Sequence, residues 1–273
     1  MLKKILVFSF VAVLLVSGSV FARKSNKIKM AGSTTVFPIA QKCAEVYMNK
    51  HPKIRITVRG GGSGVGIASI VAGKVNIGDA SRPIKNKELK KARASGINPV
   101  GNVVAKDGLS VVVNNANPIS KITVAQIKKI YTGEIVNWKE LGGPSKPIVV
   151  VSRDTSSGTY ETFETKIMKG AKVAGSALKL PSNKAVATTV AQTPDSIGYV
   201  GLGYVTEALK AIPVNGVSAS VATVNNGTYP ISRSLFMYTQ GKPKGKVKNF
   251  IDFILSSEGQ SIVSEVGFVP LTK

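Results

Sequence analysis

The chain has 273 residues and a formal charge of +23, because it contains 37 Lys and Arg residues but only 14 Asp and Glu residues. Its single cysteine excludes an intramolecular disulfide, and its single histidine leaves too few groups for a histidine-rich metal site or a Ser-His-Asp hydrolase. The positive charge attracts anions of every size, so charge alone selects no partner.

The N-terminus has the pattern of a secretory signal. Lys3 and Lys4 precede an apolar run over 5–16, and small residues end at Ala22. This run is shorter than the roughly 20 residues that span a bilayer. We therefore expect an exported, periplasmic protein, with segment 1–22 removed as a signal peptide by cleavage near Ala22. A membrane anchor that is retained is the alternative.

The first half of the remaining chain alternates between strand-like and helix-like patterns. Strands are expected over 28–30, 54–58 and 75–77, and helices over 36–47, 67–71 and 85–93. A long extended run over 103–113, interrupted at Asp107-Gly108, is predicted to cross into a second lobe.

The second half continues the alternation. Helices are expected over 124–131, 160–167, 250–255 and 260–266, and strands over 148–151, 197–200, 212–214 and 235–238. The last two strands are predicted to return to the first lobe. The sequence thus predicts an α/β fold of two lobes joined by two crossings, with 27–110 plus 207–273 in one lobe and 111–206 in the other.

Clusters of Ser, Thr and Gly follow several of these strands and precede helices, at 32–35, 60–66 and 153–159, and Ser81-Arg82-Pro83 has the same setting. A helix start offers free backbone N–H groups and the positive end of the helix dipole, and small residues let an anion approach them. Arg153 adds a planar fork of donors that suits an oxyanion. One cluster alone is ordinary helix capping, whereas several together predict an oxyanion site.

Other classes of function fit less well. The glycine-rich segment over 60–66 matches neither a nucleotide P-loop nor a dinucleotide fingerprint, so no cofactor is expected, and no metal. A hydrolase of phosphate esters with Ser157 or Thr35 as nucleophile would lack a histidine base and a metal cluster. A cationic protein that adheres to envelope polyanions would bind in a salt-dependent manner, and substitution of Arg153 or Ser157 would not affect it.

The chain resembles the substrate-binding proteins of phosphate-specific ABC importers over nearly its whole mature length. The matching segments are 32–38, 60–64, 81–83, 137–138, 153–159, 229–233 and 256–260. The resemblance implies a two-lobed, type II periplasmic binding protein of the Venus-flytrap kind. Such a protein would work as a monomer, close over inorganic phosphate and deliver it to a membrane permease, with no role for nucleic acid and no enzymatic step.

Carried over position by position, the resemblance places phosphate on residues from both lobes. The candidates are Ser33, Thr34, Thr35, Ser63, Ser81 and Arg82 from the first lobe, and Arg153, Ser157, Gly158 and Thr159 from the second.

Ser81 is a departure from the family, because well-known members have at this position an Asp that accepts the proton of hydrogen phosphate and so excludes sulfate. Asp79, Asp154 or a backbone carbonyl could accept that proton instead. Phosphate is the expected ligand. The alternative is another tetrahedral oxyanion, namely sulfate, molybdate or tungstate.

Overall fold

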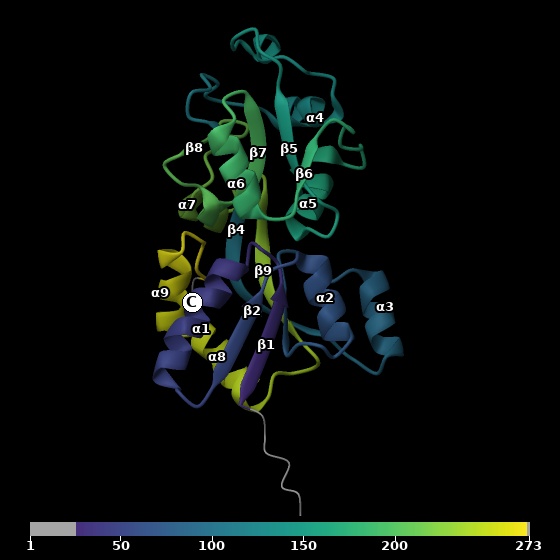
Figure 1. The fold of residues 1–273 in the computed structure, drawn as a ribbon, viewed down its shortest axis with the longest axis vertical. Helices are drawn as coiled ribbons and strands as arrows, with labels where there is room; N and C mark the ends of the chain where they lie inside the picture. The colour runs from purple at the N-terminus through teal and green to yellow at the C-terminus, as the bar shows by residue number, and fades with distance from the viewer. Residues whose placement is uncertain (1–25, 272–273) are drawn as a thin grey trace, which may run out of the picture.

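The computed structural model describes residues 26–271, so the predicted signal peptide lies outside the described residues. Two α/β lobes are stacked along the long axis of the molecule, and the strands β4 (Val100–Asn114) and β9 (Ser232–Thr239) run through both (Figure 1). The strands within the described range follow the order β2-β1-β3-β9-β4-β7-β5-β6, with β8 attached to β4. No helix of residues 26–271 is long and apolar enough to cross a membrane.

The first lobe is built on three parallel strands. Its elements are β1 (Lys27–Gly32), α1 (Phe37–Lys50), β2 (Arg55–Arg59), α2 (Ser63–Val71), β3 (Ile77–Ala80), α3 (Asn86–Ala94), α8 (Gly245–Leu255) and α9 (Ser257–Glu265). In Figure 1 the helices α1, α8 and α9 lie on one side of the sheet, and α2 and α3 on the other. Alternate residues of a strand face opposite sides, so both faces are buried in apolar clusters.

The second lobe has a parallel core in which β5 pairs with both β6 and β7. Its elements are α4 (Val124–Thr132), β5 (Val149–Arg153), α5 (Gly158–Phe163), β6 (Leu178–Leu180), α6 (Asn183–Gln192), β7 (Ser196–Gly201), β8 (Leu209–Ala211) and α7 (Val221–Asn225). The Phe163 ring stacks on Tyr199 with centroids 4.1 Å apart, and Tyr131 packs against both rings. This aromatic cluster fixes α5 against the sheet.

The predicted α/β pattern of strands and helices is present, but the return to the first lobe comes later than predicted. The sequence places residues 207–231 in the first lobe and a returning strand at 212–214. In the structure β8 pairs with β4, and Ile212, Val214, Tyr229 and Ile231 are buried in the core of the second lobe. The apolar segment 212–214, predicted as a strand that returns to the first lobe, therefore packs beside β4. The chain returns to the first lobe through β9 instead.

The predicted interruption of the long strand at Asp107-Gly108 is also wrong. β4 pairs with β9 straight through this point, with Asp107 opposite Arg233 and Gly108 opposite Ser232. The ladder is irregular instead between Val103 and Ala105. Gly108 is required by close packing, since an added Cβ would lie 2.9 Å from a methyl of Val224.

Candidate functional site

The loops at the carboxyl ends of the parallel strands of the two lobes meet in a closed cleft. Thr35 Oγ1, just before α1, lies 2.9 Å from Thr159 Oγ1 in the first turn of α5. The backbone N–H of Gly64 donates to Ser156 O at 3.0 Å, and Ser156 Oγ donates to Gly61 O at 3.3 Å. The three Ser/Thr/Gly clusters that the sequence singles out are therefore in mutual contact across the cleft.

Ser157 caps the start of α5, and Ser33 stabilises the turn that precedes α1. Ser33 Oγ accepts from the backbone N–H of Thr35 at 3.1 Å, and Ser157 Oγ accepts from that of Thr159 at 3.1 Å. All four residues are buried. These hydrogen bonds fix the backbone of the turn before α1 and of the first turn of α5.

Ser63, Ser81 and Gly158 form a second contact between the lobes. The backbone N–H of Ser81 donates to Ser63 Oγ at 2.9 Å, and the two serine oxygens are 3.3 Å apart. A Cβ added to Gly158 would lie 2.2 Å from Ser63 Oγ and 2.7 Å from Ser81 Oγ. Ser63 and Ser81 can therefore approach the start of α5 this closely only because residue 158 is glycine.

Arg153 is the last residue of β5, and 1 % of its surface is exposed. Its Nε and Nη2 donate to the carbonyls of Leu180 at 3.0 Å and Pro181 at 2.9 Å. Its Nη1 is buried and has no hydrogen-bond partner within residues 26–271. Burial lowers the pKa of this guanidinium. A buried cation with an unsatisfied donor is costly, so an anion that reached it would be bound strongly.

Asn183 and Tyr204 are cleft residues that sequence reasoning missed. Asn183 Nδ2 donates to Thr34 Oγ1 at 3.1 Å and to Thr35 Oγ1 at 3.0 Å, and its Oδ1 accepts from Gly201 N at 3.2 Å. The Tyr204 hydroxyl donates to Thr34 O at 2.5 Å. Neither residue lies in a Ser/Thr/Gly cluster, so the motif search had no signal for them.

Arg233 also lies at the site, although the sequence did not predict it there; it belongs to segment 229–233, one of those that resemble the family. Its Nη2 donates to Thr35 Oγ1 at 3.2 Å and to Asp107 Oδ2 at 2.7 Å, while Leu202 N donates to Asp107 Oδ1 at 2.9 Å. Burial raises the pKa of Asp107, and the Arg233 guanidinium and the Leu202 amide oppose that rise. The pair anchors Thr35 to the strands that connect the lobes.

Comparisons with known proteins agree with this architecture. The model of the PBP superfamily domain matches residues 19–258. The phosphate-binding protein PstS of Bacillus subtilis is 35 % identical over 252 residues, which cover 92 % of this chain and 82 % of that protein. The chain belongs to the phosphate-binding protein family.

Solved structures of family members have the same fold. A phosphate ABC transporter substrate-binding protein of Clostridium perfringens, solved with bound phosphate, is 35 % identical and superposes with a TM-score of 0.84, covering 90 % of this chain and 100 % of that one. An ABC-type phosphate transport receptor of Vibrio cholerae is 32 % identical, with a TM-score of 0.74 over 89 % of this chain and 100 % of that one.

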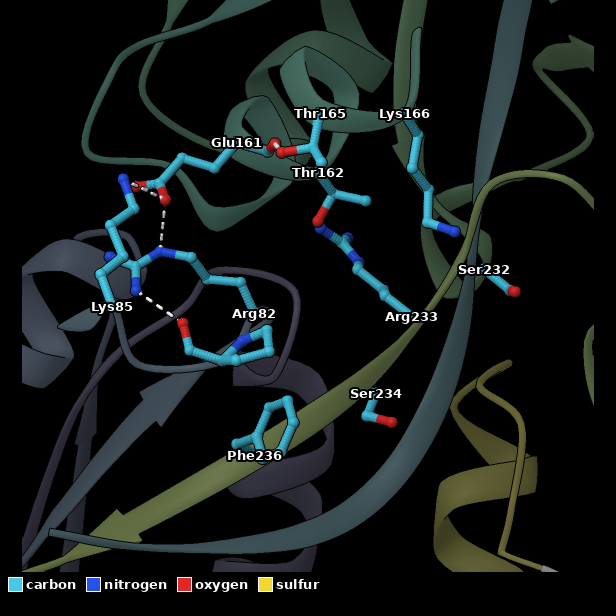
Figure 2. A pocket seen from close by; sticks show the side chains of 11 residues that line it. Arg82, Lys85, Glu161, Thr162, Thr165, Lys166, Ser232, Arg233, Ser234 and Phe236 are labelled. Carbon is cyan, nitrogen blue, oxygen red and sulfur yellow. Dashed lines mark hydrogen bonds and ion pairs between the residues drawn. The ribbon is translucent and has the colours of Figure 1, made fainter. Parts of the chain in front are cut away.

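The Arg82 side chain pairs with carboxylates rather than with the hydroxyls of the cleft. Its Nη1 and Nη2 each donate to Glu88 at 2.8 Å. Its Nε lies 2.6 Å from Glu161 Oε2, an ion pair in which the N–H is not aligned with the oxygen. Lys85 Nζ is 2.6 Å from the same oxygen (Figure 2). Because Glu161 belongs to α5, these ion pairs join the two lobes.

The carboxylates near the site of this phosphate-binding family member differ in their surroundings. Asp79 Oδ1 is buried without a hydrogen-bond partner in the described part of the chain, and burial raises the pKa of this carboxyl well above its usual range. Asp154 Oδ1 accepts from the backbone N–H of Ser156 at 2.8 Å. No group of three or more His, Cys, Asp or Glu in residues 26–271 could hold a metal ion.

Proposed function

We propose that this protein binds inorganic phosphate between its two lobes and delivers it to the membrane permease of an ABC importer. The observation that carries the proposal is the buried Arg153 guanidinium, whose Nη1 has no hydrogen-bond partner among the described residues. Arg153 comes directly before the loop that contacts the other lobe through Ser156 and Thr159. The planar fork of an arginine suits a tetrahedral oxyanion. The names of the relatives, a phosphate-binding protein and a phosphate transport receptor, support the choice of phosphate.

Capture needs no covalent change. Phosphate first meets the donors of one lobe, and rotation about β4 and β9 then brings the second set around it. The candidate ligands are Ser33, Thr34, Thr35, Ser63, Ser81, Arg153, Ser157, Gly158 and Thr159. A hydrogen bond to a charged group contributes roughly 1.5–3 kcal/mol net, so several are enough for tight binding after the cost of ordering.

The setting of this function is the cell envelope. We infer export, with removal of the signal peptide near Ala22, and action as a monomer that docks on the permease. The apolar run over 5–16 and the small residues before Arg23 support export. The relative from Clostridium perfringens, an ABC transporter substrate-binding protein, supports the permease as partner.

Replacement of Arg153 tests the proposal. Arg153→Ala removes the buried fork, and we expect phosphate affinity to fall by about tenfold or more in a calorimetric titration, because hydrogen bonds to a charged group are lost. Arg93→Ala, an exposed arginine on α3, is the matched control and should bind like the wild type. An unchanged affinity of Arg153→Ala would remove Arg153 from the site.

Titration with other anions tests the choice of ligand. We expect phosphate to bind more tightly than sulfate or molybdate. Ser81 replaces the carboxylate that repels a fully ionised anion in well-known relatives, so rejection of sulfate must come from other acceptors in the cleft. Equal affinities for phosphate and sulfate would contradict phosphate specificity while leaving an oxyanion site intact.

A further inference from the structure

A pocket of about 370 Å³ opens between the lobes beside the ion pairs of Glu161 (Figure 2). Its walls come from the segment after β3, from α5 and the turn that follows it, and from β9. The lining residues are Arg82, Pro83, Lys85, Glu161, Thr162, Thr165, Lys166, Ser232, Arg233, Ser234 and Phe236. Its volume falls in the range of roughly 300–1,000 Å³ that is typical of small-molecule sites. None of the proposed phosphate ligands lines it.

The positive charges around this pocket are only partly neutralised. Arg82 forms ion pairs with Glu88 and Glu161, and Glu161 also forms an ion pair with Lys85. Arg233 is paired with Asp107 through Nε and Nη2, but its Nη1 is buried and has no hydrogen-bond partner among the described residues.

Lys166 supplies an accessible cation from the second lobe. Among the described residues its Nζ makes a long contact, 3.5 Å to Pro230 O, and in Figure 2 the amine lies toward Ser232, whereas the Arg233 guanidinium lies toward Thr162. Lys166 Nζ therefore offers an anionic group an accessible donor, and the buried Arg233 guanidinium adds positive charge to the pocket wall.

The remaining wall of the pocket is apolar. Phe236 and Pro83 line it, and the Phe236 ring is stacked on Tyr238 with centroids 5.6 Å apart, which holds it in place. Inorganic phosphate would leave this wall uncovered. A ligand with one anionic group and a small flat apolar body would cover this wall and reach Lys166 at the same time.

We propose that this pocket is a second binding site, for a small organic carboxylate with a flat apolar body. The carboxylate binds Lys166, and the apolar body lies against Phe236 and Pro83. Because both lobes supply the walls, the ligand binds the closed form better than an open one. By reciprocity, phosphate and the carboxylate then increase each other's affinity. This coupling rests on the proposed phosphate function, whereas the pocket itself does not.

Benzoate is a suitable probe. It is titrated by calorimetry into the full mature protein, with and without one equivalent of phosphate. We expect benzoate to bind and the neutral analogue benzamide not to bind. In Lys166→Ala the affinity for benzoate should fall about tenfold, because a charged hydrogen bond is lost, while phosphate affinity stays unchanged. Lys172→Ala, an exposed lysine of the same lobe outside the pocket, is the control.

Each outcome has a distinct meaning. Equal binding of benzoate and benzamide, or equal binding of benzoate to the wild type and Lys166→Ala, means an adventitious additive only and overturns the site. Benzoate affinity that is independent of bound phosphate overturns the coupling. If phosphate itself fails to bind, the phosphate-free titration still tests the pocket, so the two proposals fail separately.

Discussion

Asp79 is the residue whose environment makes the clearest prediction about stability. Its buried carboxyl has a pKa well above the usual range, since burial disfavours the charged form. The folded protein therefore holds this proton at pH values where the unfolded chain, with a pKa of about 3.9, has released it. Stability contributed by this group is complete below that unfolded pKa and declines as the pH rises toward the folded pKa.

Asp79→Asn should remove the free-energy cost of burying an ionised carboxylate at this position. We expect the variant to unfold at higher urea concentration than the wild type at about pH 7, and the difference to shrink toward about pH 4. Asp252→Asn, an exposed carboxyl on α8, should show no such pH-dependent gain. A difference between Asp79→Asn and the wild type that is the same at every pH would show that ionisation of Asp79 is not its cause.

Gly158 is the residue at which a single methyl group tests closure. The nearest atoms to an added Cβ are Ser63 Oγ and Ser81 Oγ, and both belong to the opposite lobe. Gly158→Ala should therefore fold normally but resist closing, with phosphate affinity lowered about tenfold or more by the overlap. Gly175→Ala, where an added Cβ meets nothing within 4 Å, is the matched control. Wild-type affinity in Gly158→Ala would mean that the lobes do not close in this way around phosphate.

At the scale of elements, α5 connects the two lobes through Glu161 as well as through its first turn. The Glu161 side chain is 12 % exposed and faces Arg82 and Lys85 of the other lobe. Glu161→Gln should leave phosphate association nearly unchanged and raise its dissociation rate by roughly tenfold, because a buried ion pair across the closed cleft is lost. Stopped-flow measurement separates the two rates.

Glu164→Gln is the control for this prediction, since Glu164 follows α5 but is not paired with the other lobe in any ion pair of the described residues. If Glu161→Gln changed only the association rate, the ion pairs would steer the anion rather than hold the lobes together. If neither rate changed, the contact would contribute nothing to closure.

The elements also show what the sequence could and could not reveal. Strands followed by Ser/Thr/Gly clusters and helices carry strong local signals, so the sequence predicts that the loops around Thr35, Ser63 and Ser157 meet. α6 was missed because its Ala- and Thr-rich sequence has weak apolar periodicity, and Asn183 was missed with it. The direction of the Arg82 side chain depends on Glu88 and Glu161, and spacing along the chain does not encode which carboxylate is nearest.

At the scale of the whole molecule, the two lobes each have their own core, while β4 contributes to both cores and β9 pairs with β4 where the lobes meet. Which lobe receives residues 209–231 was therefore a question of tertiary packing rather than of local pattern. An apolar strand-like segment fits either core, and the choice is made by pairing with β4. Because residues 209–231 pack on the second lobe, Arg233 of β9 contacts Thr35 and also lines the pocket proposed to bind a carboxylate.

The net charge of the whole chain predicts how phosphate arrives. Removing Lys3 and Lys4 with the signal reduces the charge from +23 to +21. A field of this sign speeds the encounter with an anion, so the association rate should fall several-fold between about 20 mM and about 500 mM salt, with little change in dissociation. Lys87→Gln with Lys90→Gln, two exposed lysines of α3 outside the cleft, should weaken this salt dependence without altering dissociation. A cationic protein that only adheres to polyanions would behave differently, since its dissociation would accelerate with salt and Arg153→Ala would leave its binding intact.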